Sequence, residues 1–229
     1  MKNIKVLITS GGTKIPIDSV RSITNMSRGT FGSKIAAETD LLSIHNNHNI
    51  YIDFLYAKES RCPFSLNTEN HRSHEYVTFW DYARELDILL QKQPDIIILA
   101  AAVSDYEVEN VVDGKIRTKE DLVIRLKPLP KLISTVREKC PNAVICGFKL
   151  LVNSTEEELT TEATKSLISN KLDLVIGNDL RDIKANNHKL VIVEDLYDNI
   201  TVQRYSSKNY NLAYVVIKQC LELHNIKQW

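Results

Sequence analysis

Short apolar runs alternate with longer amphipathic segments along most of this chain. The runs are rich in β-branched residues and have the length of single strands, so they predict strands at residues 4–9, 50–55, 95–103, 144–148, 173–176 and 190–193. Several runs, such as IIILAAAV, are apolar on both faces. Strands of that kind are typical of a parallel sheet that helices cover on both sides.

The segments between these runs carry apolar residues at helical spacing. They predict helices at residues 28 to about 43, 80–91, 130–139, 155–169 and 207 to about 226. Pro130 suits a first helical turn, Thr155 precedes three glutamates, and Ser206 or Ser207 is the expected N-cap of the last helix. Strands that alternate with helices in this way imply βαβ units, so the pattern predicts an α/β fold with a doubly wound sheet.

Two segments break the alternation. Residues 62–74 are polar, and we expect a surface loop there. Residues 105–127 contain an Asp-Gly turn signal and alternating polarity, which predict an antiparallel excursion or a mobile flap beside the sheet. No repeat or Gly/Ser-rich linker divides the chain, so a single domain over residues 1–229 is the simplest interpretation.

Composition narrows the function classes. The 229 residues include 29 basic and 29 acidic side chains, and 43% of the chain is apolar. A neutral balance argues against sequence-blind nucleic-acid binding and against a polybasic membrane anchor. No apolar run has the length of a membrane helix, the first residues have a strand pattern instead of a signal-peptide pattern, and the four cysteines are scattered. We therefore expect a cytoplasmic protein with reduced thiols and no membrane or nucleic-acid partner.

The first candidate for chemistry is the turn after the first predicted strand. Gly11 and Gly12 stand at the carboxyl end of that strand, where ligands bind in open α/β sheets and where glycine lets the backbone approach a phosphate. An ordinary tight turn explains the same residues. The GxGxxG pattern of a dinucleotide site is absent.

A second glycine-bearing turn strengthens the phosphate interpretation. Asn25, Ser27, Gly29 and Gly32 lie at the start of the next predicted helix, where free N–H groups and the helix dipole favour an anion. Four of the seven glycines in the chain fall between residues 11 and 32. Such a cluster in a glycine-poor protein predicts close backbone approach to a phosphate or nucleotide.

Further candidates follow later strands. Small residues at 100–102 leave room for a ligand, and Asp105 can bind a ribose, a substrate amide or Mg²⁺, or can simply cap a turn. Lys115 and Arg117 lie two apart on the predicted flap and either close over a polyphosphate or form a solvated charge pair. Phe148 ends a strand and either stacks on a base or packs in the core.

Taken in order, the motifs SGGT, PIDSVRSITNMSRGTFG, AAVSDY, GKIR, GFKL and LDLVIGND resemble the phosphopantothenate–cysteine ligases of coenzyme A biosynthesis. The resemblance runs from about residue 4 to about residue 195. The chain is similar to the stand-alone bacterial form of these ligases. It implies a Rossmann-like fold with a mostly parallel sheet, helices on both faces and an antiparallel flap, and it implies a homodimer. The implied reaction joins 4′-phosphopantothenate to L-cysteine through an acyl-nucleotide, with CTP or ATP as co-substrate, Mg²⁺ as cofactor and pyrophosphate as a product.

The resemblance also implies roles for individual residues. Asn25 is expected to polarise the acyl-nucleotide carbonyl, and Lys115 is the expected essential lysine of the flap. Nucleotide contacts are implied at Gly11, Gly12, Ser27, Gly29, Phe31, Gly32, Ala100, Ala101, Asp105, Lys115, Pro130, Ile133, Phe148 and Asn178. Substrate contacts are implied at Arg21, Asn25, Ala101, Ala102 and Asp105, with Arg21 reaching the substrate phosphate of the neighbouring subunit. The ligands of the metal are left unassigned.

The chain departs from the family pattern at several positions. The usual Ser-Ser-Gly-Lys is replaced by residues 27–30, Ser-Arg-Gly-Thr, and Lys131 replaces a common aspartate. Leu151 stands where a glutamate is frequent, and two nucleotide-binding lysines fall at Ser166 and Asn170. The choice between CTP and ATP therefore stays open.

Two other functions fit parts of the pattern. A non-catalytic nucleotide- or flavin-binding module could use the same sheet, but it would have little use for a flap lysine. An NAD(P)-dependent reductase is disfavoured, because the dinucleotide fingerprint and a ribose-binding acid after the second strand are both missing.

Overall fold

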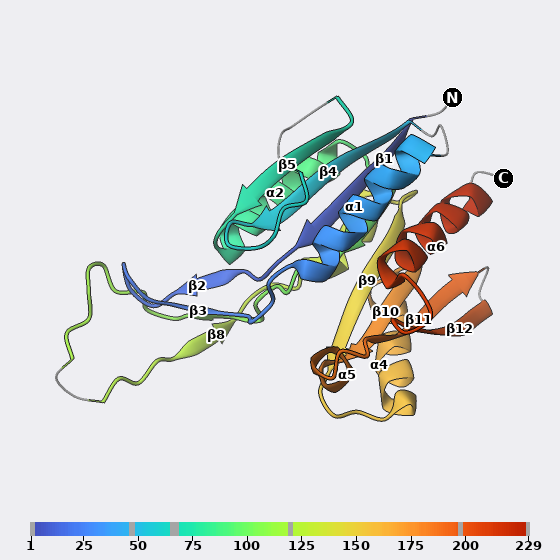
Figure 1. The fold of residues 1–229 in the computed structure, drawn as a ribbon. Coiled ribbons are helices and arrows are strands. Elements are labelled where there is room, and N and C mark those ends of the chain that lie inside the picture. The colour runs from blue at the N-terminus through green and yellow to red at the C-terminus, as the bar shows by residue number, and fades with distance from the viewer. Residues whose placement is uncertain (1–2, 46–48, 65–68, 119–120, 197–198, 228–229) are drawn as a thin grey trace.

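A computed structural model describes residues 3–45, 49–64, 69–118, 121–196 and 199–227 (Figure 1). Among these residues, eight strands form one sheet in the order β12-β11-β10-β9-β6-β1-β4-β5. They are β1 (Ile4–Ser10), β4 (Ile50–Ala57), β5 (His71–Tyr76), β6 (Ile96–Leu99), β9 (Val144–Leu151), β10 (Leu174–Asp179), β11 (Lys189–Leu196) and β12 (Asn199–Ser206).

The sheet is doubly wound. The chain runs outward from β1 to β4 and β5, then crosses to β6 and continues outward to β9 and β10, and neighbours in this set are parallel. The last two strands, β11 and β12, are added antiparallel at one edge. The Rossmann-like, mostly parallel α/β fold expected from the sequence is confirmed. The order reverses between β1 and β6, and ligands of such sheets bind at that reversal.

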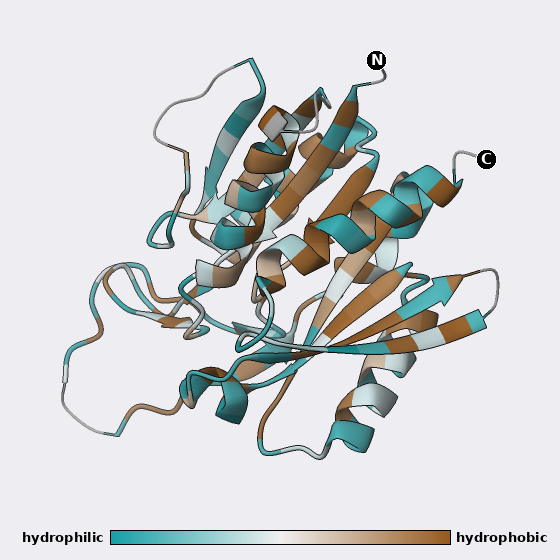
Figure 2. Cartoon of the chain, turned by 45° about the vertical axis from the view of Figure 1, so that its right-hand side comes forward, coloured by the Kyte–Doolittle hydropathy of each residue, from teal (hydrophilic) through white to brown (hydrophobic). Residues whose placement is uncertain are grey.

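Helices cover both faces. On one face α1 (Thr30–His45) and α6 (Leu212–Lys227) pack side by side on alternate strand residues such as Val6 and Ile8 (Figure 1). On the other face α2 (Phe79–Gln91), α3 (Ile133–Lys139) and α4 (Glu156–Ser169) pack on the intervening residues, Leu7 among them. Figure 2 shows the central strands in the brown of apolar residues, as expected for strands that are buried on both sides.

Local signals explain where two of these helices begin. Thr78 and Asp81 form a reciprocal capping box at the start of α2, and Thr155 and Glu158 form a second at the start of α4. In each box the threonine hydroxyl and the acidic side chain satisfy backbone N–H groups that a helix leaves without partners. The second box agrees with the helix start expected from the run of glutamates.

An arm of two small antiparallel sheets projects from the carboxyl edge of the main sheet (Figure 1). One sheet pairs β2 (Lys14–Pro16) with β3 (Ser22–Thr24), and the other pairs β7 (Tyr106–Val108) with β8 (Leu126–Pro128). We call residues 14–24, 105–118 and 121–128 the arm. A small buried cluster of Ile15, Phe79, Val108 and Leu129 fixes its base to α2. The antiparallel excursion expected after residue 105 is confirmed by the β7–β8 pair.

Several expectations about elements were wrong, and Pro130 does not lie in a first helical turn, because α3 begins at Ile133. Residues 71–76 form β5 and not a loop, because a strand at the edge of the sheet keeps polar side chains toward solvent; residues 65–68 lie outside the described part. Strand β12 carries no strong apolar pattern and was not expected. The last helix begins at Leu212, since Asn211 Oδ1 accepts a hydrogen bond from the Tyr214 backbone N–H at 3.3 Å, whereas Ser206 ends β12 and Ser207 lies in the turn that follows.

Within the described ranges, no helix is both long enough and apolar enough to cross a membrane.

Candidate active site

Three distant segments meet at the carboxyl edge, between β1 and β6. The Ala102 backbone N–H donates to the Gly11 carbonyl at 2.7 Å, and the Thr13 N–H donates to the Ala102 carbonyl at 3.2 Å. The Asn25 amide Nδ2 donates to the same Ala102 carbonyl at 2.8 Å. The turn after β1, the loop before α1 and the segment after β6 are therefore one hydrogen-bonded junction, which we call the edge junction.

Buried hydroxyl groups brace this junction, and the sequence analysis missed them. Thr9 Oγ1 accepts the Ala101 N–H at 3.2 Å, and Thr13 Oγ1 accepts the Ser104 N–H at 2.9 Å. The hydroxyl of Tyr76 donates to the Ser10 carbonyl at 2.8 Å, and burial raises the pKa of this phenol well above its usual range. The available signal was the set of polar residues Thr9, Ser10 and Thr13 at and just beyond the end of an otherwise apolar strand, because polar groups are buried there only when they have partners.

The glycines of the two turns pack against their own chain. Gly29 has φ of +66°, and a Cβ there would lie 2.7 Å from Ser10 Oγ and 3.0 Å from the Gly11 nitrogen. A Cβ on Gly32 would lie 2.6 Å from Ser10 Oγ, and one on Gly11 would lie 2.6 Å from the Ala57 Cβ. Glycine is thus required for the two turns to approach each other, whatever ligand binds beside them.

The loop that leads into α1 is open to solvent. Asn25, Met26, Ser27 and Arg28 are exposed, with Met26 at 93% exposure. The Ser27 hydroxyl lies 3.4 Å from the Gly29 N–H and accepts from it. This loop and the first turn of α1 leave backbone N–H groups and short polar side chains facing outward, which is the arrangement that helix N-termini use to bind anions.

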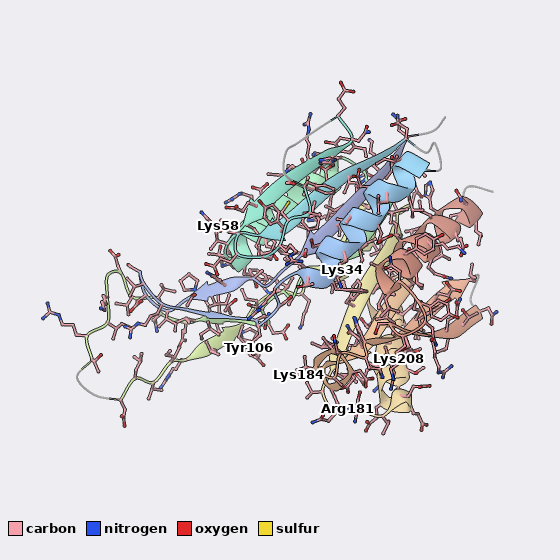
Figure 3. The ribbon with its side chains drawn as sticks, viewed as in Figure 1. Lys34, Lys58, Tyr106, Arg181, Lys184 and Lys208 are labelled. Atoms are coloured by element: carbon pink, nitrogen blue, oxygen red, sulfur yellow. The ribbon has the colours of Figure 1, made fainter. Side chains whose placement is uncertain are left out.

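A cavity of about 630 Å³ adjoins this loop on the side of β4 and β5. Gly12, Asn25 and Ser27 line it together with residues 57–61 and Tyr76. Lys58, Glu59 and Arg61 line it on that side, and Lys58, which Figure 3 labels, lies 3.7 Å from the Glu75 carboxylate. Sequence reasoning missed residues 57–61, because no motif marks them.

An aromatic and amide cluster lies on the other side of the α1 N-terminus. The ring of Phe31 meets Phe148 edge-on with centroids 6.0 Å apart and meets His188 with centroids 5.0 Å apart. Asn178 Nδ2 lies 3.3 Å from His188 Nε2, while the buried Asn178 Oδ1 has no hydrogen-bond partner among the described residues. Phe31, Phe148 and Asn178 were expected here, and His188 was missed because it belongs to none of the motifs.

Positive charge surrounds this cluster. Burial lowers the pKa of His188, and the positive charge of Lys34 lowers it further against the opposing effect of Asp182, so this imidazole is neutral at pH 7. Figure 3 shows Lys34 on α1 and the cations Arg181, Lys184 and Lys208 around α5 (Leu180–Lys184). These four cationic side chains can attract a polyanionic ligand to the carboxyl edge of the sheet.

Asp105 lies at the start of the arm and is exposed. It forms an ion pair with Lys131, and its backbone carbonyl accepts the Leu129 N–H at 2.9 Å. The lysine that departs from the family pattern therefore neutralises the expected ligand-binding carboxylate. Pro130 is exposed beside this pair, and Ile133 is half-buried against the sheet, where its Cδ1 would lie 3.5 Å from a Cβ on Gly147.

Arg21 and Lys115 lie away from the edge junction, at the outer part of the arm. The loop of residues 112–116 is hydrogen-bonded to residues 17–21 and not to either glycine turn (Figure 1). Neither residue lines the cavity beside Asn25. The structure thus brings together the expected residues at 11–32 and 100–105, and it holds the two expected arm cations apart from them within one chain.

Metal ligands were left unassigned from the sequence. Among the residues that the structure describes, no three His, Cys, Asp or Glu side chains are grouped so as to hold a metal ion.

Comparison with known proteins places this geometry in a family. A family model described as "DNA/pantothenate metabolism flavoprotein C-terminal domain" matches residues 1–44 and 77–223. The unmatched residues 45–76 contain β4, β5 and one wall of the cavity.

Curated relatives share this part of the chain. The coenzyme A biosynthesis bifunctional protein CoaBC of Thermococcus kodakarensis is 35% identical over 189 residues, which are 82% of this chain and 44% of that protein. The phosphopantothenate–cysteine ligase CAB2 of Saccharomyces cerevisiae is 25% identical over 98% of this chain and 77% of its own length. The chain spans less than half the length of the CoaBC protein that it matches.

Solved structures have the same fold. The DNA/pantothenate metabolism flavoprotein from Streptococcus pneumoniae superposes with a TM-score of 0.82 at 33% identity, covering 96% of this chain and 100% of that one. A Cab2 mutant in complex with phosphopantothenate-cysteine superposes with a TM-score of 0.79 at 25% identity, covering 98% of this chain and 87% of that one.

Proposed function

The chain belongs to the family of the DNA/pantothenate metabolism flavoprotein C-terminal domain, and we propose that it joins 4′-phosphopantothenate to L-cysteine in coenzyme A biosynthesis. The observation that carries the proposal is the edge junction, where Gly11, Asn25 and Ala102 meet beside the free N-terminus of α1. The names of the relatives, a bifunctional coenzyme A protein and a phosphopantothenate–cysteine ligase, support the same reaction.

The first step activates the acid. The carboxylate oxygen of phosphopantothenate attacks the α-phosphorus of CTP or ATP, an O–P bond forms, and the bond between the α- and β-phosphates breaks to release pyrophosphate. Two anions must be brought together in line, so the site has to neutralise charge and hold both groups in position. Backbone N–H groups of the two glycine turns and of the α1 N-terminus suit that task, and Lys115 adds a cation.

The second step forms the amide. The cysteine nitrogen attacks the acyl carbon, a C–N bond forms, the bond from that carbon to the phosphate oxygen breaks, and nucleoside monophosphate leaves while the nitrogen gives a proton to solvent. Asn25 has two amide N–H groups, and the Ala102 carbonyl accepts one of them. The other is free to donate to the acyl oxygen, which becomes more negative during the attack. No protein nucleophile is needed, because the acyl-nucleotide is already activated.

The aromatic and amide cluster suits a nucleotide base. Phe31 and Phe148 offer ring surfaces beside the base site. Asn178 is only 8% exposed, and its unpartnered Oδ1 can accept a hydrogen bond from an exocyclic amine of the base. Cytosine and adenine both carry such an amine, whereas uracil does not. This chemistry supports CTP or ATP as the co-substrate without choosing between them.

Mg²⁺ fits this donor set as a partner of the triphosphate. The ion uses one or two protein carboxylates together with phosphate oxygens and waters, so the lack of a three-residue cluster among the described residues is compatible with it. Asp105, beyond the end of β6, is the carboxylate that we propose for such an ion, and it would have to exchange its contact with Lys131. When bound, the ion would neutralise phosphate charge.

A homodimer completes this site. The arm exposes apolar side chains, with Val20 at 62%, Val111 at 54% and Val123 at 83% exposure, and a second copy of this chain is the occupant that we propose for them. The same arm holds Arg21 away from the edge junction of its own chain. In the dimer, Arg21 binds the substrate phosphate at the partner's site.

The reaction is tested by adding phosphopantothenate, L-cysteine, Mg²⁺ and either CTP or ATP to the purified chain. We expect pyrophosphate release that requires phosphopantothenate, and we expect an acyl-nucleotide by mass spectrometry when cysteine is omitted. Absence of pyrophosphate with both nucleotides contradicts the proposal. A binding module without catalysis would instead bind nucleotide with the same affinity whether or not phosphopantothenate is present.

A further inference from the structure

The outer part of the arm is held together by one buried carboxylate, that of Asp18. Its Oδ1 accepts the backbone N–H groups of Val20 at 2.9 Å and of Arg21 at 2.8 Å. Its Oδ2 accepts Arg21 Nε at 3.0 Å, Arg21 Nη2 at 2.5 Å and the backbone N–H of Ile116 at 3.1 Å. One oxygen therefore shapes the local turn, and the other ties the Arg21 side chain to the loop that carries Lys115.

Further hydrogen bonds join the turn of residues 18–21 to the loop that carries Lys115. Arg21 Nη2 donates to the Ile116 carbonyl at 2.9 Å, and Ser19 and Gly114 exchange hydrogen bonds at 3.0 Å and 2.9 Å. Within the described part of the chain, Arg21 Nη1 donates no hydrogen bond, and the side chain is 41% exposed. Arg21 can thus bind an anion through its outer edge while its inner edge stays on Asp18.

We propose that Asp18 is a positioning residue that locks Arg21 and the Lys115 loop into one cationic unit, so that both cations act on the same active site. The inference rests on the proposed ligase function, because that function gives Arg21 the substrate phosphate and Lys115 the triphosphate. If the unit is rigid, Arg21 and Lys115 of one chain cannot reach the active sites of two different subunits. If the arm serves the partner subunit, Lys115 goes there together with Arg21.

The Asp18→Asn variant separates the lock from the fold of the turn. An asparagine keeps an oxygen for the Val20 and Arg21 N–H groups, but its NH₂ group replaces the oxygen that binds the Arg21 side chain and the Ile116 N–H. Asp113→Asn is the matched control, because it removes the same charge from an exposed position of the same loop.

Hydrogen exchange measured by mass spectrometry tests the lock without any assay of activity. In Asp18→Asn the amides of residues 112–117 should exchange about tenfold or more faster, as expected when a hydrogen bond to a charged group is lost, while Asp113→Asn matches the wild type. Unchanged exchange in Asp18→Asn would mean that Asp18 does not hold the loop. Thermal melting of all three proteins separates this local effect from general unfolding.

Steady-state kinetics then test the positioning role. Asp18→Asn should raise KM for phosphopantothenate through Arg21 and lower kcat through Lys115. Arg21→Ala should raise that KM with little effect on kcat, and Asp18→Asn added to Arg21→Ala should leave the KM almost unchanged while still lowering kcat. Additive effects on KM would show that Asp18 does not act through Arg21.

Mixed dimers test whether both cations serve one site. Chains with Arg21→Ala and chains with Lys115→Met are co-expressed with different tags, and the heterodimers are purified. With phosphopantothenate far below the KM of the Arg21→Ala variant, each site of this heterodimer lacks one cation if both residues of an arm reach the same site, and activity stays at the level of the single variants. Recovery to about half of wild-type activity would show that the two residues act in different sites, and would overturn the proposal.

A second heterodimer tests the proposed function separately from the proposed role of Asp18. Asn25→Ala paired with Arg21→Ala should regain activity if the arm acts on the partner, since one of its two sites is then intact. Failure of that pair, or a wild type that releases no pyrophosphate, counts against the proposed function. The exchange of residues 112–117 still decides whether Asp18 locks the arm.

Discussion

The edge junction and the arm are built in opposite ways. At the edge junction, buried hydroxyls and backbone groups of β1, α1 and the segment after β6 are bonded to one another, and glycines let the turns touch. The arm has a small apolar cluster at its base and one buried carboxylate at its outer part, and it leaves several apolar side chains exposed. The edge junction is therefore held by hydrogen bonds to the end of the central sheet, whereas the outer arm is organised mainly by polar contacts within itself.

Because of this difference in construction, we expect the two regions to have different roles in the reaction. A triphosphate needs donors whose positions do not change during the reaction, and the edge junction can hold the neighbouring N–H groups at the α1 N-terminus in such fixed positions. The arm can place charge far from its own sheet, where another subunit can use it. Substitutions in the edge junction should therefore affect stability or chemistry, and substitutions in the outer arm should affect function with little effect on stability.

The largest expected effect concerns the chemistry at the edge junction. Asn25→Ala should lower the rate of amide formation by about 10²–10³, because it removes the donor proposed for the acyl oxygen. Stopped reactions should accumulate an acyl-nucleotide that mass spectrometry can identify. Asn142→Ala, an exposed asparagine in the turn before β9, is the control and should leave the rate unchanged. Normal turnover in Asn25→Ala would remove this residue from the mechanism.

A smaller effect on rate is expected from the arm. Lys115→Met should lower kcat by about 10- to 100-fold, the loss of one charge-assisted hydrogen bond, with an unchanged melting temperature. Arg125→Met removes the same charge from an exposed position of the same arm and should leave kcat as it is. Equal losses in both variants would indicate a general electrostatic effect of the arm instead of a specific contact by Lys115.

A pair of glycine substitutions compares the two regions in stability. Gly29→Ala combines a positive φ with overlap against Ser10 and Gly11, so the free energy of unfolding should fall by about 3 kcal/mol. Gly114→Ala also has a positive φ, +89°, but nothing lies within 4 Å of its Cβ, so about 1 kcal/mol is expected. Urea unfolding measures both. Equal losses would contradict the contrast between a packed junction and an open arm.

The last prediction is a pH dependence of stability at the end of β10. Burial raises the pKa of Asp179, but hydrogen bonds from the Ser154 and Arg181 backbone and the Ser154 hydroxyl outweigh it and lower that pKa from 3.8 to about 2. A lowered folded-state pKa stabilises the protein above the unfolded value, and this contribution is lost as pH falls from about 4 toward 2. The stability difference between wild type and Asp179→Asn should shrink over that range in urea titrations. A constant difference would mean that the Asp179 pKa is not lowered.

Most of the fold could be predicted from the sequence, because apolar runs and helical spacing report burial directly. The strands of the main sheet that were missed, β5 and β12, are its two edge strands and include polar residues such as His71 and Arg204. An edge strand does not need the continuous apolar run that identifies a central one. The extra strands could be recognised only from their pairing with β4 and β11.

The candidate site was predictable where local motifs carry the information. Gly11, Asn25 and Ala102 stand in turns whose sequence marks the carboxyl edge, and the structure joins them. His188 and the residues at 57–61 come from segments with no such signal, and only the fold brings them to the edge. The position of Lys115 depends on Asp18, a contact between residues 98 apart, so the spacing along the chain gives no indication of it.

The pair of Asn25→Ala and Arg21→Ala chains tests the central claim most directly, namely that the edge junction of one subunit and the arm of another form one site. A purified heterodimer has one site with both defects and one with neither, while each homodimer has two damaged sites. At a phosphopantothenate concentration far below the KM of the Arg21→Ala variant, where both homodimers are nearly inactive, the account predicts that pyrophosphate release in the heterodimer recovers to about half of the wild-type rate. A rate no higher than the mean of the two homodimers would contradict the claim.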